Sequence, residues 1–328
     1  MKSHISKGNG KALRGPYKDY AVAAGALVAP CLMPELNSVL QFFIPGAAAA
    51  YLDSGSLQKR LLFLLALYVI ISVAFFSVGM VASALILAQG VVICGVLVIS
   101  AYRGVDAPRN VIVLSITILL MAIIVVGMSS GWKINELYSQ MITAMTKEYD
   151  KAIELYKKSS GTSIPPQLDQ LVASIKATLV AYFPGIICSF FVFLSFTNTL
   201  AFMRISMLRG KGTGLMPEFN EWRMPGWLVW LFIFFGFMAL VPDGPWPAIG
   251  RNGILVVCIF YLIQGFSVMQ FFFKVMQTPV YVRYLVYALI GIQWYGLLLV
   301  VFTGLMDYWF DFRKRLIKKL QASEDNEE

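Results

Sequence analysis

Side chains that could carry acid–base, nucleophilic or metal chemistry are few and poorly placed for it. The only histidine, His4, lies in a polar N-terminal stretch, which excludes a Ser-His pair or a histidine proton relay within the apolar segments. The cysteines stand far apart within apolar runs, at Cys31, Cys94, Cys188 and Cys258. Because no Cys-x-x-Cys pair or Cys/His cluster occurs, we expect packing residues and predict no metal site and no cofactor.

Two motifs approach the pattern of a known site and lack a required residue. Residues 210–214 read Gly-Lys-Gly-Thr-Gly, but Ile205 replaces the leading glycine of a phosphate-binding loop, and Gly212 stands where Ser or Thr must bind magnesium. The segment Gly304–Asp307 lacks the second glycine of aspartyl intramembrane proteases, and no matching aspartate lies within another apolar segment. We therefore predict that the chain is not an enzyme.

Polar side chains within or between apolar segments remain as candidates for a binding site. Such groups are costly in hydrocarbon, which makes each a candidate for function, although their ordinary role is a hydrogen bond between helices worth about 0.6 kcal/mol. Glu35 and Asn37 differ because they lie at a turn between two apolar segments, where a solute can arrive from outside the membrane. We predict a ligand-binding site formed by Glu35, Asn37, Gln41, Gln89 and Asn198.

A bundle of membrane helices has to position these side chains. Of the 328 residues, 58% are hydrophobic and only 14% charged, with a mean hydropathy of +0.71, whereas about 25% of residues are charged in soluble domains. This composition excludes a disordered chain, a coiled coil and a disulfide-rich module. The apolar segments are 20–34, 38–52, 60–78, 80–101, 110–128, 177–203, 226–241, 253–274 and 280–306.

These segments predict an all-α, polytopic transmembrane bundle with eight crossings, or nine in the alternative interpretation. The two interpretations differ in whether 226–241, the shortest late segment, crosses the bilayer. The net charge of +9 would suggest a nucleic-acid partner in a soluble protein, but basic residues of membrane proteins collect in cytoplasmic loops. We expect no nucleic-acid partner. The basic stretches 1–19, 210–225 and 313–328 then lie in the cytoplasm, together with the N-terminus.

Residues 131–176 form the one clearly amphipathic region. Apolar residues recur at helical spacing from Ile134 to Ile153, and a second apolar stripe follows Pro165 and Pro166. We predict an extracytoplasmic amphipathic helical hairpin. Two roles remain open, a lid that shields the bundle or rests on the lipid interface, and a gate over a binding site.

Two further patterns indicate contacts with lipid or with another protein. Small residues stand four apart on one face of the first segment, a pattern that lets helix backbones approach closely and predicts a helix-docking face at Ala21, Gly25 and Ala29. An aromatic belt followed by basic residues at the other end of the chain predicts a membrane anchor. Its residues are Tyr308, Trp309, Arg313, Lys314 and Arg315.

The C-terminal pattern also carries a family resemblance. The runs Gly304–Asp307 and Phe310–Arg315, with Arg223-Met224-Pro225, Asn252 and Tyr261–Gly265, resemble the YybS-like family of uncharacterised bacterial membrane proteins. This resemblance implies a multi-pass protein of the bacterial inner membrane and no assigned activity.

Residues 20–209 are more distantly similar to the S components of energy-coupling-factor transporters. The resemblance implies a six-span core with both ends cytoplasmic, a coupling subunit docked on Ala21, Gly25 and Ala29, and solute entry at 34–41. Residues 131–176 and the C-terminal helices in 226–312 have no counterpart in a minimal S component.

Two functions follow as hypotheses. The first is a small-solute-binding or transport subunit, whose partners are the lipid bilayer, a small-molecule solute and another membrane subunit docked on the first helix. The alternative is a non-catalytic scaffold or accessory subunit of a larger membrane complex. The two differ in whether the polar span residues converge on a cavity or lie singly between helices.

Overall fold

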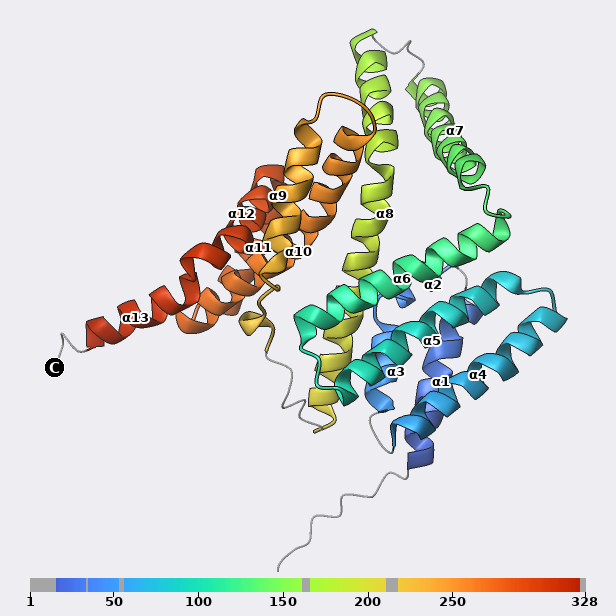
Figure 1. Ribbon diagram of the computed structural model, residues 1–328, viewed down its shortest axis with the longest axis horizontal. Coiled ribbons are helices and arrows are strands. Elements are labelled where there is room, and N and C mark those ends of the chain that lie inside the picture. Colours follow the sequence, from blue (N-terminus) through green and yellow to red (C-terminus); the bar gives the residue numbers. More distant parts are fainter. Residues whose placement is uncertain (1–15, 34, 53–55, 161–165, 211–217, 325–328) are drawn as a thin grey trace, which may run out of the picture. The chain divides into compact units, whose positions relative to one another are not determined.

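The computed structural model describes residues 16–33, 35–52, 56–160, 166–210 and 218–324, and the described part is helical, without strands (Figure 1). The all-α prediction is therefore confirmed. The helices are α1 Pro16–Leu32, α2 Asn37–Leu40, α3 Ile44–Tyr51, α4 Leu57–Ser77, α5 Val81–Tyr102, α6 Ala107–Ser129, α7 Ile134–Ser160, α8 Pro166–Leu208, η1 Phe219–Glu221, α9 Trp227–Leu240, α10 Trp246–Val275, α11 Val280–Ile292, α12 Trp294–Phe310 and α13 Phe312–Glu324.

Five helices of the described part are long and apolar enough to cross a membrane: α4, α5, α6, Ala173–Leu208 of α8, and α10. Helices α11 and α12 would make a sixth crossing if the pair, bent by 110°, is one broken span. The predicted eight or nine crossings are not confirmed, because a crossing needs about 20 residues. The 17 residues of α1, the 8 of α3 and the 14 of α9 fall short of that length.

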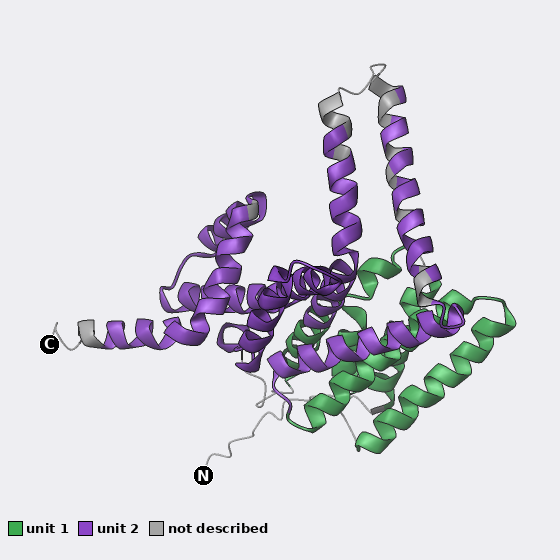
Figure 2. Ribbon diagram, turned by 45° about the horizontal axis from the view of Figure 1, so that its top comes forward, with its two compact units in different colours: residues 1–104, 197–213 green, residues 105–196, 214–328 purple. Residues whose placement is uncertain are grey.

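The chain divides into two compact units, coloured separately in Figure 2. Unit 1 comprises residues 1–104 and 197–213, so α1 to α5 pack there with the last turns of α8. Its core contains fully buried alanines, which let α1 and α3 approach closely: Ala23, Ala48, Ala49 and Ala50. At one end, Arg209, the residue after α8, pairs with Asp19 of α1 at 2.6 Å and lies over the Tyr51 ring.

Unit 2 comprises residues 105–196 and 214–328, and α10 lies at its centre between α9 and α12. Glycines make both contacts close. A Cβ atom at Gly304 of α12 would collide with the backbone of Tyr261, and one at Gly250 of α10 with the backbone of Ala239 in α9. These helices therefore pack backbone against backbone.

Helix α7 lies beside the N-terminal part of α8 within unit 2 (Figure 2). Lys176 of α8 pairs with Asp150 of α7 at 3.0 Å, and the Tyr138 ring of α7 packs against Phe183. Residues 161–165, between the two helices in the sequence, lie outside the described residues. An extracytoplasmic position for this pair stays a prediction.

Candidate functional site

The candidate site is an apolar cavity of about 580 Å³ in unit 2. Five helices line it. They contribute, among others, Leu119 of α6, Tyr138 of α7, Cys188 of α8, Phe235 of α9 and Val256 of α10. Three of these helices, α6, α8 and α10, are candidate spans. The cavity therefore lies among segments that we expect to be surrounded by lipid.

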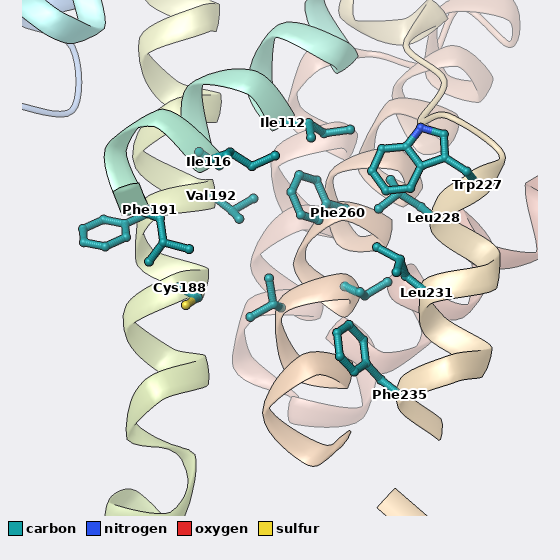
Figure 3. Close-up of a pocket in the computed structure, with 14 residues that line it drawn as sticks. Ile112, Ile116, Cys188, Phe191, Val192, Trp227, Leu228, Leu231, Phe235 and Phe260 are labelled. Carbon is teal, nitrogen blue, oxygen red and sulfur yellow. The ribbon is translucent and has the colours of Figure 1, made fainter. Parts of the chain in front are cut away.

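Two smaller cavities share lining residues with the first. One, of about 360 Å³, is lined by Tyr138 and Met141 of α7 and by Phe183 and Phe191 of α8. The other, of about 180 Å³, is shown in Figure 3, where Ile112 and Ile116 of α6 face Phe260 of α10. All three cavities are lined by α6 and α8. Helix α7 adds to the two larger ones, and α9 and α10 add to the main cavity and to the smallest one.

Pro184 lies inside α8 and lines the main cavity. Pro184 has no backbone N–H, so the Val180 carbonyl loses its partner within the helix and instead accepts a hydrogen bond from the Tyr138 hydroxyl at 3.4 Å. One residue later, the Asn252 carboxamide of α10 inserts between Gly185 and Ala181. The Gly185 N–H donates to Asn252 Oδ1 at 2.7 Å, and Asn252 Nδ2 donates to the Ala181 carbonyl at 2.9 Å.

The polar groups in the cavity walls are already engaged by the protein. Asn252 Nδ2 also donates to the Ala248 carbonyl at 2.8 Å, and the Ser115 hydroxyl donates to the Val111 carbonyl at 2.6 Å. The Tyr138 hydroxyl donates to Val180, as described above. A ligand therefore meets a surface made mostly of hydrocarbon and aromatic rings, together with the thiol of Cys188.

The five predicted ligand residues lie in unit 1 and do not line these cavities. Two of them are brought together, since Asn198 Nδ2 donates to the Gln41 carbonyl at 2.9 Å. Asn198 Oδ1 also accepts the Gly46 N–H at 2.8 Å. Asn37 stands one helical turn before Gln41, Glu35 is exposed, and Gln89 is half-buried in α5.

The predicted docking face is open on one side. Ala21 and Gly25 are exposed, Ala29 is half-buried, and a Cβ atom at Gly25 would meet no described atom within 4 Å.

Four of the predicted anchor residues, Tyr308, Trp309, Lys314 and Arg315, are exposed. Arg313 differs, because it is only 3% exposed and donates to the Asn220 and Trp222 carbonyls at 2.9 and 2.8 Å. Its charge is therefore not presented to lipid headgroups as the sequence pattern predicted. The buried side chain instead faces Asp307, with 3.7 Å between Nη2 and Oδ2.

A family model described as a predicted membrane protein, DUF2232, matches residues 21–308. The chain belongs to this family. No curated protein and no solved structure matches it. The resemblances to the YybS-like family and to S components stay predictions.

Two polar clusters of unit 2 were not predicted from the sequence, one around Asn252 and one around Asp307. The sequence patterns connect Asn252 of α10 only with the family resemblance and not with the backbone of α8. They also do not identify Asp307 as the partner of Gln264, which donates to it at 3.4 Å. Two signals were available: the proline inside the apolar run 177–203, and an aspartate at the end of 280–306. Each requires a polar partner from elsewhere in the chain.

Proposed function

We propose that this integral membrane protein binds, and moves or presents, a lipid-like solute in the apolar cavity of unit 2. The observation that supports the proposal is a cavity of about 580 Å³ whose polar wall groups already bond to the protein. Its volume falls within the range of about 300 to 1,000 Å³ that is usual for ligand sites. The proposal assigns no catalytic step.

The chemistry of the walls selects the class of solute. A polar solute would lose its hydrogen bonds to water and find no replacement in this cavity, which is strongly unfavourable. A hydrocarbon chain loses nothing on entering it and gains close contacts with the aromatic and aliphatic walls. The small solute expected from the sequence is accordingly an amphiphile with a long acyl or prenyl chain.

Helix α7 supports the gate interpretation of the amphipathic region. Tyr138 lines the main cavity and the smaller one beside it, and Met141 lines the latter. Movement of α7 would therefore open or close the cavity. In this proposal the chain spans the bacterial inner membrane with its N-terminus in the cytoplasm, as the charge pattern predicts.

Binding of cis-parinaric acid, a fluorescent long-chain fatty acid, tests the proposal in the purified full-length protein. We expect saturable binding that Ala248→Trp, which fills the main cavity, weakens by about tenfold, equivalent to about 1.4 kcal/mol. The matched control is Ala288→Trp on α11, an exposed alanine of the same unit that does not line the three cavities. Equal binding by both variants would contradict the proposal.

An accessory subunit is the second candidate, and the open face at Gly25 favours it. We expect Gly25→Leu to abolish co-purification of a membrane partner, because the larger side chain prevents close approach of a second helix. Ala74→Leu, at an exposed alanine of α4, is the control. If Gly25→Leu retains every protein that the wild type retains, this face does not dock a subunit.

A further inference from the structure

Unit 1 contains a break in its helical structure at which polar groups collect. Helix α2 has only four residues, and a turn at 41–43 separates it from α3. Asn198 of α8 bridges the break, because its carboxamide bonds to both the Gln41 carbonyl and the Gly46 N–H. A Cβ atom at Gly46 would collide with the Asn198 backbone, so α3 and α8 touch directly here.

Two side-chain oxygens at this break accept no hydrogen bond from any residue that the structure describes. They are Oε1 of Gln41, whose side chain belongs to a residue only 7% exposed, and Oδ1 of Asn37. The Gln41 carboxamide cannot turn over to relieve this, because its Nε2 donates to the Ile86 carbonyl of α5 at 3.3 Å. A buried acceptor without a donor is unfavourable and requires a partner.

The two oxygens lie on the same face of the chain, because residues four apart in a helical turn are neighbours. Both are neutral carboxamide oxygens, and the acidic residue nearest to them in the sequence, Glu35, is exposed. Neutral oxygens at an interrupted membrane helix suit a monovalent cation, as at the unwound helices of ion-coupled transporters. A divalent cation would favour carboxylate ligands.

We propose that Gln41 and Asn37 bind a monovalent alkali cation, Na⁺ or K⁺, at the break between α2 and α3. Bound there, the cation supplies the positive partner that both oxygens lack. This site lies in a different unit from the apolar cavity and does not depend on the proposed function.

Thermal unfolding of the purified full-length protein in NaCl, KCl or choline chloride at equal ionic strength tests the proposal. We expect one alkali cation to raise the Tm saturably relative to choline, because a ligand that binds only the folded state stabilises it. Gln41→Met should weaken the apparent affinity for that cation by about tenfold, equivalent to about 1.4 kcal/mol. The matched control is Gln89→Met in α5 of the same unit, which should leave the affinity unchanged.

Asn37→Ala provides a second variant in case Gln41→Met does not fold, since Asn37 is only half-buried. It too should weaken the cation effect. Equal Tm values in the three salts would overturn the proposal and indicate that water alone satisfies the two oxygens. A cation effect that survives in both Gln41→Met and Asn37→Ala would overturn it as well, because the ion would then bind elsewhere.

Discussion

Arg313 shows that a residue of a basic run can be buried although the sequence pattern predicts an exposed side chain. Arg313 belongs to a basic run, yet its guanidinium is held inside unit 2 by two backbone carbonyls, by the Ser267 hydroxyl at 3.1 Å and by Asp307. Burial lowers the pKa of Arg313, and the charge of Asp307 opposes that effect. The pair fixes α13 to the 3₁₀ turn η1, because Asn220 and Trp222 supply the carbonyls.

Removal of one partner should destabilise the protein more than removal of both. Arg313→Met leaves Asp307 as an uncompensated buried charge, and we expect a loss of about 3 to 5 kcal/mol in the free energy of unfolding. The double variant Arg313→Met/Asp307→Asn should recover part of that loss, whereas Arg315→Met at the exposed neighbour should change little. Chemical unfolding of the four proteins measures these differences. A double variant no more stable than Arg313→Met would show that the two charges are not coupled.

Asp311 makes a second ion pair, which predicts a pH dependence. A hydrogen bond from Arg223 at 2.7 Å, with another contribution from Lys314, lowers the pKa of Asp311 from 3.8 to about 2. Because the folded-state pKa is lowered, this pair stabilises the protein fully above pH 3.8, and the contribution disappears as the pH falls towards about 2. The Tm difference between wild type and Asp311→Asn should therefore shrink over this range. A difference that stays constant down to pH 2 would contradict the assignment.

At the scale of elements, α10 and α12 depend on glycine. A Cβ atom at Gly265 would collide with the Val300 carbonyl, as one at Gly304 would with Tyr261. We expect Gly304→Leu to force the helices apart and cost about 1–3 kcal/mol or more in the free energy of unfolding. Gly236→Leu in α9, where a Cβ meets nothing within 4 Å, is the control. A comparable loss of unfolding free energy in both variants would mean that close packing of α10 against α12 does not stabilise unit 2.

The apolar pattern predicted the long helices well and the short ones poorly. Segments 60–78, 80–101 and 110–128 match α4, α5 and α6 to within a few residues, because an uninterrupted apolar run of span length leaves a helix as the only structure that satisfies its backbone. Segment 38–52 was read as one span but divides into α2 and α3. The carboxamide of Asn198 bonds to the backbone of Gln41 and of Gly46, at the turn between α2 and α3. Because Asn198 lies about 150 residues further along the sequence, no local pattern predicts this division.

The candidate sites could be predicted only in part, because their contacts join residues that lie far apart in the sequence. Gln41 and Asn198 were chosen as costly polar groups in apolar segments, and the structure does bring them together. The cavity of unit 2 has no such signal, since its walls are apolar residues like those of any membrane helix. Pro184 and Asn252 both line it, but they are 68 positions apart in the printed sequence and no local pattern connects them.

On the scale of the whole molecule, the two units carry different chemistry. Unit 1 holds a small polar cluster at a helix break, and unit 2 holds an apolar cavity among candidate spans. Helix α8 contributes to both, with residues up to 196 in unit 2 and the following ones in unit 1. We therefore propose a separate function for each unit, and the main proposal is that unit 2 holds an apolar ligand.

Native mass spectrometry of the gently solubilised full-length protein tests directly whether unit 2 holds an apolar ligand. The wild type is compared with Ala248→Trp and Ala288→Trp. We expect one tightly retained amphiphile per chain in the wild type and in Ala288→Trp, and its loss in Ala248→Trp, because tryptophan occupies the space of the ligand. A bare chain in all three, or the same retained lipids in all three, would contradict it.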